Sequence, residues 1–439
     1  MIKTIFKVAI KLLIVSSFAI CCGLFLSKVA RPSTYQETDN TKEKVDGFYA
    51  LENNSIDVLG LGTSHLYCAL NPGGLYYFTG LSLYDFAGQC QSMEVSYAYL
   101  VEALKTQSPK LVILDLFGLS HEANQCQMNS SSRINIQDLK PSLNKLQAYE
   151  TLYDNDLITN FFDLKLYADN LKNINLSAID DILKHKSNFY YGFTPIYPSD
   201  FNIYTREQVQ ANELVAPNER ELKAFMAIIE LCKANDIPLL VVKTPYFITQ
   251  EDANIYAYAY EVCKEHNIPY IDFNYMLEEI GYGFGLDGDS WHANVTGSYK
   301  ITKYLSEYIM QNYAIEPIGK CNNTLQELYF ETLQIVFKTV NNFDLLRTYL
   351  DYYDVTALIN DSKDMFGMGH ATIVYNKDLM YYDRFFTNGI HNVEMLEDSS
   401  VYVDGELIVQ GYYQEMIVVI DNLSGKVIDC INVDERMGD

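Results

Sequence analysis

Apolar runs of strand length alternate with amphipathic segments between residues 56 and 309. The runs lie at residues 56–61, 111–116, 237–244 and 268–273. The segments beside them place apolar residues at helical spacing: Met93, Tyr97, Leu100, Val101 and Leu104; Leu222, Phe225, Met226, Ile229 and Cys232; Ile255, Tyr258, Ala259, Val262 and Cys263; Ile301, Leu305, Tyr308 and Ile309. Continuous apolar strands alternating with such helices predict an α/β domain, in which helices cover both faces of a parallel sheet.

A separate apolar segment occupies the amino terminus. Residues 12–26 are uncharged, three lysines precede them, and Lys28 and Arg31 follow. The run is shorter than the roughly 20 residues that span a bilayer, unless flanking lysines extend to the interface. We predict a signal anchor over residues 1–30, a single-pass transmembrane helix in the cell membrane; a cleaved signal peptide is the alternative. Lysines that stay inside would place the remaining chain outside the cytoplasm.

Composition shifts divide the rest of the chain. Residues 31–54 are polar and predict a linker. The α/β domain is expected over residues 55–315, with an insertion at about 120–216. Residues 320–439 predict a small α+β accessory domain, because a helical pattern leads into short strands around turns at Asp404-Gly405 and Ser424-Gly425.

Charge and cysteine usage exclude two kinds of ligand. The formal net charge is −25, which disfavours nucleic acid as a partner. Nine cysteines contain no C-x-x-C pair, so neither a structural zinc nor another metal site is predicted. Cys232 and Cys263 fall on apolar helical faces and are expected to be reduced core thiols. A disulfide framework cannot be read from the spacing.

Candidate chemistry lies where the first strand ends. Ser64 follows that strand in Gly-Thr-Ser-His, a sequence that also suits a plain turn or helix cap. Far downstream, Asp289 precedes His292 by three positions, just before the last helix of the domain. A serine hydroxyl needs a neighbouring base, imidazole suits that task, and a carboxylate can orient the ring. Ligand sites of such sheets lie outside the carboxyl ends of the strands.

Four segments together resemble the SGNH/GDSL hydrolase superfamily, a fold of three layers. They are "GLGTSHLYCALNP", "YDFAGQCQSMEVSYAYLVEALKTQSPKLVILDLFG", "LLVVKTPY" and "DGDSWHANVTGSYKIT". The likeness spans about residues 55–315 and is strongest to the membrane-anchored bacterial branch associated with cell-surface polysaccharide modification. The carboxyl-terminal end is similar to the interleukin-like EMT-inducer (PANDER-like) domain.

The resemblance implies roles for individual residues. Ser64 would be the acyl-accepting nucleophile, His292 the base and Asp289 its acidic partner. The amides of Ser64 and Gly88 would form the oxyanion hole. No cofactor is implied, and the expected partners are a cell-surface glycan or acyl donor and a membrane protein that supplies the acyl group.

One family feature is missing from the third motif. The strand "LVILDLFG" ends without the usual oxyanion-hole asparagine, and either Gln91 or Asn71 is expected to replace it. Asp115, close to that position, is interpreted as structural. His65, Gln91 and Trp291 are candidate substrate contacts, although loop hydrogen bonding explains His65 and packing explains Trp291 equally well.

The sequence is therefore consistent with two functions. One is an extracytoplasmic serine esterase or O-acyltransferase that acts on acyl groups, acetyl first among them, of a surface polysaccharide. The other is a glycan-binding or assembly protein that has kept the fold without catalysis, which the missing asparagine favours.

Overall fold

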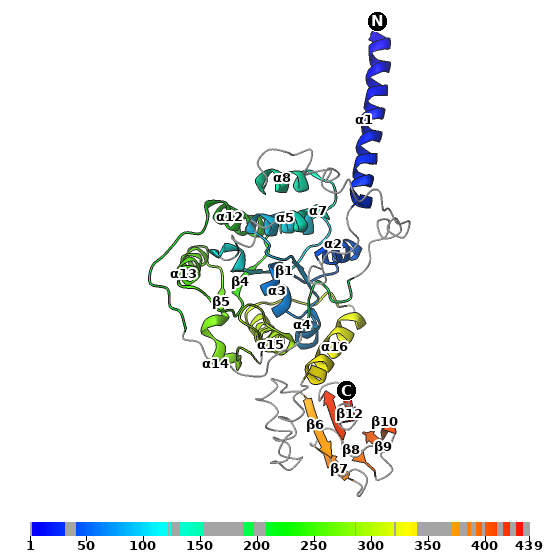
Figure 1. Cartoon of the computed structure of the whole chain (residues 1–439), viewed down its shortest axis with the longest axis vertical. Coiled ribbons are helices and arrows are strands. Elements are labelled where there is room, and N and C mark those ends of the chain that lie inside the picture. Colours follow the sequence, from blue (N-terminus) through cyan, green and yellow to red (C-terminus); the bar gives the residue numbers. More distant parts are fainter. Residues whose placement is uncertain are drawn as a thin grey trace.

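The structure is a computed structural model of the 439-residue chain (Figure 1). It describes residues 2–30, 41–121, 123, 132–152, 188–196, 208–285, 287–319, 322–339, 371–376, 384–387, 392–396, 400–410, 416–421 and 427–432.

A five-stranded parallel sheet forms the centre of the α/β domain. Its strands are β1 (Val58–Gly62), β2 (Leu83–Ala87), β3 (Leu111–Asp115), β4 (Leu239–Lys243) and β5 (Tyr270–Asp272), in the order β2-β1-β3-β4-β5. Neighbours are in register from their first residues, since Val58 pairs with both Leu83 and Leu111. The carboxyl ends of β1 and β2 therefore lie level at one edge. The predicted parallel α/β sheet is confirmed.

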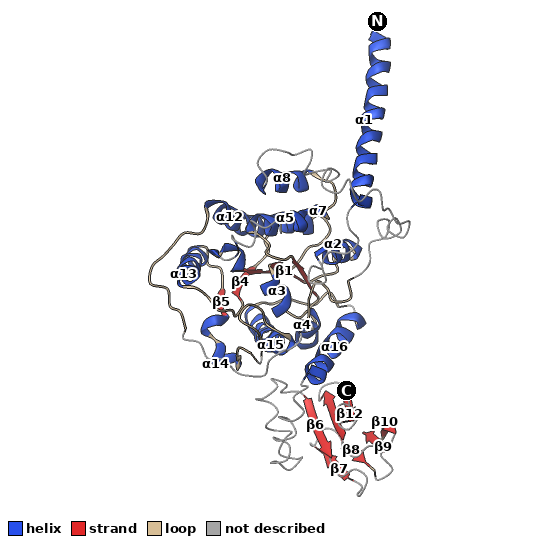
Figure 2. Cartoon of the chain, in the orientation of Figure 1, coloured by secondary structure: helices blue, strands red, loops and turns tan. Residues whose placement is uncertain are grey.

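Helices cover both faces of this sheet and complete three layers (Figure 2). One face packs against α2 (Thr41–Ala50), α5 (Met93–Ala103), α12 (Glu219–Ala234) and α13 (Gln250–Glu265). The opposite face packs against α3 (Ser64–Ala69), α4 (Pro72–Thr79) and α15 (Val295–Asn312). Alternate strand residues enter the two cores, Leu59 and Leu61 one and Val58 the other, because successive side chains of a strand point to opposite faces.

Shorter elements follow several strands. They are the 3₁₀ helices η1 (Leu116–Leu119) and η4 (Phe273–Tyr275) and the helices α7 (Ser132–Gln137), α8 (Leu143–Leu152) and α14 (Leu277–Ile280). Within the predicted insertion at 120–216, α7 and α8 lie beside α5. The Tyr99 hydroxyl of α5 donates to the Asn135 carbonyl of α7 at 2.6 Å. Much of the insertion lies outside the described residues.

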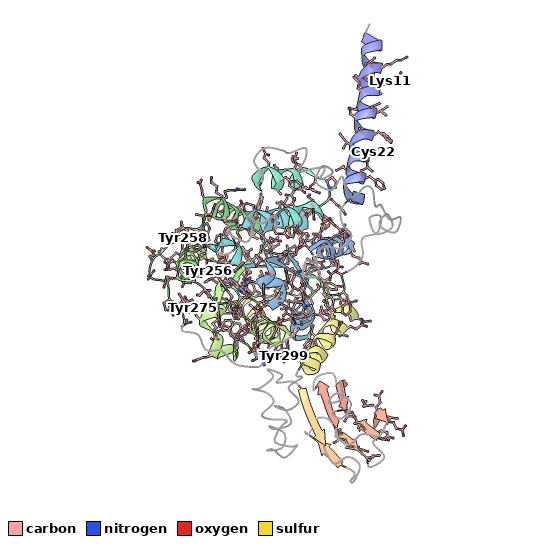
Figure 3. The ribbon with its side chains drawn as sticks, viewed as in Figure 1. Lys11, Cys22, Tyr256, Tyr258, Tyr275 and Tyr299 are labelled. Atoms are coloured by element: carbon pink, nitrogen blue, oxygen red, sulfur yellow. The ribbon has the colours of Figure 1, made fainter. Side chains whose placement is uncertain are left out.

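Helix α1 (Ile2–Ala30) contains an apolar stretch long enough to cross a membrane. That stretch, Phe6–Leu26, has 21 residues, which at 1.5 Å each span about 31 Å. It is longer than the uncharged run at 12–26 because it continues past Lys11 and Lys7. Lys11 and Cys22 are labelled on this helix in Figure 3.

The predicted linker at 31–54 is wrong from residue 41 onward, because α2 is part of the domain. Val45 and Phe48 are buried, and the Phe48 ring stacks on Phe86 of β2 with centroids 4.2 Å apart. The Tyr84 hydroxyl donates to the Lys44 carbonyl at 2.6 Å. Only two of the four apolar side chains in this ten-residue segment are buried, which is too few to show helical periodicity in the sequence.

The predicted start of the accessory domain at residue 320 also needs correction. Helix α16 (Asn323–Thr339) packs on α4 of the α/β domain. The rings of Tyr329 and Tyr77 stack at 4.0 Å, and the Asn71 amide donates to Thr332 Oγ1 at 3.0 Å. A Cβ on Gly73 would lie 2.6 Å from the Tyr329 backbone nitrogen, so this approach requires glycine.

Two antiparallel sheets follow α16. One has the order β10-β9-β8-β7, and the other β12-β11-β6. The strands are β6 (Ala371–Asn376), β7 (Arg384–Thr387), β8 (Asn392–Met395), β9 (Ser400–Val403), β10 (Glu406–Gln410), β11 (Met416–Asp421) and β12 (Val427–Asn432). Asp404 and Gly405, both at positive φ, join β9 to β10 as a two-residue hairpin turn, as predicted. The predicted turn at Ser424-Gly425 lies outside the described residues.

Candidate active site

Ser64 stands at the carboxyl edge of the sheet, at the start of helix α3. Strand β1 ends at Gly62, and Thr63 caps α3 by accepting the His65 backbone N–H on its side-chain oxygen at 3.2 Å. Thr63 is an N-cap residue of the type that helices prefer. The cap fixes where the helix begins, and so presents the half-buried Ser64 hydroxyl at the strand end.

His292 lies in a loop that is tied down at several points. Gly288 and Ala293 form a β-bridge across the loop, and the Phe247 N–H donates to the Ser290 carbonyl at 2.9 Å. At its base, the buried Lys300 ammonium lies 2.8 Å from the Asp287 carboxylate. These contacts hold His292 at a defined position before α15 begins.

The structure brings Ser64 and His292 together. The Nε2 of His292 lies 2.9 Å from the Oγ of Ser64, although 228 positions separate the two residues in sequence. That distance is within the range expected of a nucleophile and its base. Two of the three residues predicted to carry the chemistry are thus in contact.

Asp289 is placed differently from the predicted geometry. One carboxylate oxygen accepts the backbone N–H groups of Trp291 and His292, each at 2.7 Å, and the side chain is exposed. Among the residues that the structure describes, the Asp289 carboxylate makes no hydrogen bond to the His292 ring. Asp289 therefore shapes the turn that carries His292, and acts on the imidazole through its charge.

Opposing influences set the pKa of His292. Burial lowers this pKa below its ordinary value, the Asp289 carboxylate raises it, and the Lys243 ammonium lowers it. Lys243 is fully buried at the end of β4, where its Nζ donates to the Thr244 carbonyl at 2.7 Å and lies 4.2 Å from the Tyr246 ring centroid. A neutral imidazole can accept the Ser64 proton, so these conditions suit His292 to the role of a base.

His65 forms a wall beside the pair. It is 2% exposed, its ring stacks on Phe117 with centroids 3.7 Å apart, and its centroid lies 5.1 Å from that of His292. Burial lowers the His65 pKa well below its ordinary value, and Lys243 lowers it further. Within the part of the chain that the structure describes, the buried Nδ1 has no hydrogen-bond partner. The ring is thus neutral, and its predicted contact with substrate stays a prediction.

Gly88 follows β2, level with the residue that follows β1. A Cβ at Gly88 would lie 2.1 Å from the Asn135 side-chain oxygen. The Asn135 amide nitrogen donates to the Gln89 carbonyl at 2.9 Å, which holds the loop after Gly88. Cys90 in the same loop is disulfide-bonded. The predicted oxyanion-hole loop is therefore fixed from two sides, and only glycine fits at its first position.

Neither expected substitute for the missing asparagine is free to donate to an oxyanion. Gln91 is fully buried, and its amide nitrogen donates to the Ser96 hydroxyl at 3.0 Å, which also argues against its predicted contact with substrate. Asn71 caps α4 and donates to Thr332. Asp115 accepts the Phe117 N–H at 3.0 Å, in agreement with a structural role.

Trp291 lies at the rim of the site. It is 40% exposed, and its ring stacks on Tyr246 with centroids 6.0 Å apart. The Trp291 ring therefore packs on Tyr246 and is also accessible to a ligand. Among the residues the structure describes, no group of three His, Cys, Asp or Glu side chains could hold a metal ion.

Three residues of the site were missed from sequence. Lys243 could have been noticed, because it is a charged residue ending the apolar run "LLVVK". Tyr246, whose hydroxyl donates to the Asp252 carboxylate at 2.9 Å, and Asn135, which comes from the insertion, carry no local signal.

Replacing Asp289 with asparagine tests the charge assignment. The asparagine oxygen can still accept both N–H groups of the turn, while the charge that raises the His292 pKa is lost. The acid limb of kcat/KM, expected below pH 6.5 in the parent, should move to still lower pH. The maximal rate should fall about tenfold, because an exposed charge acts weakly through space.

The measurement is the pH profile of ester hydrolysis for both proteins. Replacing a carboxylate that is hydrogen-bonded to the ring lowers kcat by about 10⁴-fold. A loss of that size, or a limb that moves to higher pH, would contradict the placement of Asp289.

The fold and the contacts define an α/β protein with a serine–histidine pair at the carboxyl edge of its parallel sheet. No family model matches the chain, and no curated protein matches its sequence. Among solved structures, one described as a "putative lipolytic protein of G-D-S-L family" from Desulfitobacterium hafniense aligns with a TM-score of 0.28 and 10% identity, covering 57% of this chain and 97% of that chain. A likeness of this strength carries no functional conclusion, so function is inferred from side-chain geometry.

Proposed function

We propose that the chain is an extracytoplasmic serine esterase or O-acyltransferase that acts on acyl groups, acetyl first among them, of a cell-surface polysaccharide. The contact of 2.9 Å between Ser64 Oγ and His292 Nε2 carries the chemical part of this proposal. Helix α1, which is long enough to cross a membrane, and the disulfide at Cys90 support a location outside the cytoplasm.

The first half of the reaction follows from the pair. His292 Nε2 takes the Ser64 proton while Oγ attacks the carbonyl carbon of the acyl ester. The carbonyl oxygen becomes an oxyanion, to which the amides of Ser64 and Gly88 are proposed to donate. The bond to the leaving sugar oxygen then breaks, and the His292 imidazolium returns its proton to that oxygen. The acyl group remains as an ester on Ser64.

The second half repeats these steps with a new nucleophile. Water or a sugar hydroxyl gives its proton to His292 and attacks the Ser64 ester, and the imidazolium then protonates Ser64. Water yields hydrolysis, and a sugar hydroxyl yields transfer. The exposed ring of Trp291 at the rim is a surface on which a sugar could pack.

A fluorophosphonate probe tests the proposal directly, because it forms a covalent bond with an activated serine. The full chain in detergent should be labelled at Ser64, as peptide mass spectrometry can verify. Labelling should disappear in Ser64→Ala and in His292→Ala. If the intact protein is not labelled, acyl chemistry is rejected in favour of a binding protein with this fold.

A further inference from the structure

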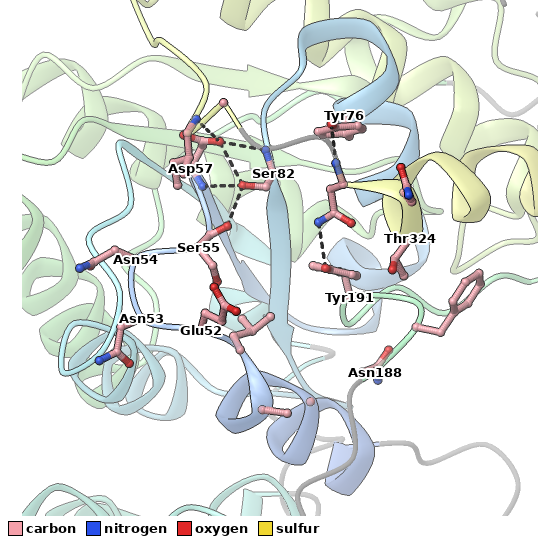
Figure 4. A pocket seen from close by; sticks show the side chains of 18 of the residues that line it. Glu52, Asn53, Asn54, Ser55, Asp57, Tyr76, Ser82, Asn188, Tyr191 and Thr324 are labelled. Atoms are coloured by element: carbon pink, nitrogen blue, oxygen red, sulfur yellow. Dashed lines mark hydrogen bonds between the residues drawn. The ribbon is translucent and has the colours of Figure 1, made fainter.

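A hollow lies at the amino-terminal ends of the strands, opposite the carboxyl ends where Ser64 lies. It has a volume of about 630 Å³ and is lined by Asp57 and Ser82, which directly precede β1 and β2 (Figure 4). Ser64 follows the other end of β1, and five strand residues span about 16 Å. This hollow is therefore separate from the candidate active site.

Uncharged polar side chains and phenol rings dominate the lining. We call the hollow the amide cavity and define it by Asn53, Asn54, Asn188, Tyr76, Tyr191 and Thr324. Amide groups both donate and accept hydrogen bonds, and phenol rings add an apolar face with a polar edge. A volume between 300 and 1,000 Å³ is typical of small-molecule sites.

Charge narrows the class of ligand. Among the described residues that line the cavity there is neither Lys nor Arg, and the carboxylates are those of Glu52 and Asp57. Asp57 is occupied, because it accepts the Lys110 ammonium and the Ser82 hydroxyl, each at 3.0 Å. The ammonium beside the cavity, that of Lys110, is already engaged by Asp57 and by the Glu316 carbonyl, so among the described residues an anionic ligand would find no free counter-charge. One paired and one exposed carboxylate do not make a site for a metal ion.

The walls are held in place before any ligand arrives. The Asn322 N–H donates to the Tyr76 hydroxyl at 2.8 Å, and the Asn322 amide donates to the Tyr191 hydroxyl at 2.9 Å. The Tyr191 carbonyl accepts the Asp85 N–H of β2 at 2.9 Å, which fixes that wall to the sheet. Binding would thus cost little ordering of these residues.

We propose that the amide cavity binds an uncharged oligosaccharide. Sugar hydroxyls match the amides, and the C–H faces of a sugar ring match Tyr76 and Tyr191. The proposal does not depend on acyl chemistry at Ser64. If both proposals hold, the chain binds a polymer at the amino-terminal ends of the strands and acts on it at their carboxyl ends.

The test uses the full chain carrying Ser64→Ala, so that no turnover occurs, in a detergent without a sugar head group. Saturation-transfer NMR and calorimetry would be recorded with tetramers of glucose, galactose and N-acetylglucosamine. A galacturonate tetramer serves as the anionic probe. We expect at least one uncharged tetramer to bind with a Kd below about 1 mM, and the anionic tetramer to bind at least tenfold more weakly.

Two variants and one matched control locate the site. Asn54→Gly removes an amide at a residue with φ of 52°, which glycine adopts freely, and Thr324→Trp fills the cavity. Each should raise the Kd at least tenfold. Asn267→Gly makes the same change at φ of 55° in an exposed turn outside the cavity, and should leave the Kd unchanged.

Three results would overturn the proposal. The first is that no uncharged tetramer binds at 10 mM. The second is equal binding by Asn54→Gly, Thr324→Trp and Asn267→Gly, which would place the ligand elsewhere. The third is a preference for the anionic tetramer. Fluorophosphonate labelling of Ser64 in the same cavity variants, made without Ser64→Ala, should match the parent, which separates failure here from failure of the catalytic proposal.

Discussion

Replacing Ser64 with alanine is expected to lower kcat/KM for an acetyl ester by about 10⁶-fold, and His292→Ala should cost nearly as much. The hydroxyl and the imidazole act as one unit, because each is of little use without the other. The double variant should therefore lose no more than either single variant. Hydrolysis of a chromogenic acetyl ester, followed to the background rate, gives all three values.

Circular dichroism is the control for folding, since Ser64→Ala removes one oxygen from a half-buried position. Single losses that multiply in the double variant would show that the two residues act independently. That result, or a Ser64→Ala protein that keeps more than about 1% of the activity, would reject Ser64 as the nucleophile.

Replacing Gly88 with alanine is the second change expected to have a large effect. The new Cβ would lie 2.1 Å from the Asn135 side-chain oxygen, so the loop or Asn135 must move. Alanine keeps the backbone N–H, so any loss of activity would come from displacement of this N–H and not from its removal. Displacing one oxyanion donor should lower kcat by about 10²–10³-fold, with little change in KM.

Removing the Asn135 side chain gives a matched test of this clash. The double variant Gly88→Ala, Asn135→Ala should regain at least tenfold of the lost kcat, because the Cβ then has room. Asn135→Ala alone, which loses the bond to the Gln89 carbonyl and the longer one from the Thr41 hydroxyl, reports the cost of loosening the loop. If Gly88→Ala is as active as the parent, Gly88 does not contribute to an oxyanion hole.

Local patterns predicted four of the five strands of the sheet but missed β2 (Leu83–Ala87), and they placed Ser64 at the end of the first strand. The apolar runs at 56–61 and 111–116 became β1 and β3 within two residues. Ser64 and His292 were expected to meet because both follow buried parallel strands, whose carboxyl ends share one edge. That argument needs only the parallel direction of the strands, which the alternation of strands and helices predicts.

The parts that the sequence did not predict depend on tertiary contacts. Helix α2 is stabilised by Phe48 stacking on Phe86, and α16 by Tyr329 stacking on Tyr77; neither contact leaves a periodic pattern. The engagement of Gln91 by Ser96 is equally invisible, since an amide in a loop does not reveal its partner. Residue type could therefore suggest an oxyanion donor but could not show whether it was free.

The two charges that act on His292 differ in their access to solvent, and this gives dissolved ions an asymmetric influence. Asp289 is exposed, whereas Lys243 is fully buried. Mobile ions screen exposed charges much more than buried ones, with a Debye length of about 8 Å at physiological ionic strength. Added salt therefore weakens the effect of the carboxylate on the His292 pKa and spares that of the ammonium, so rising ionic strength favours the uncharged imidazole.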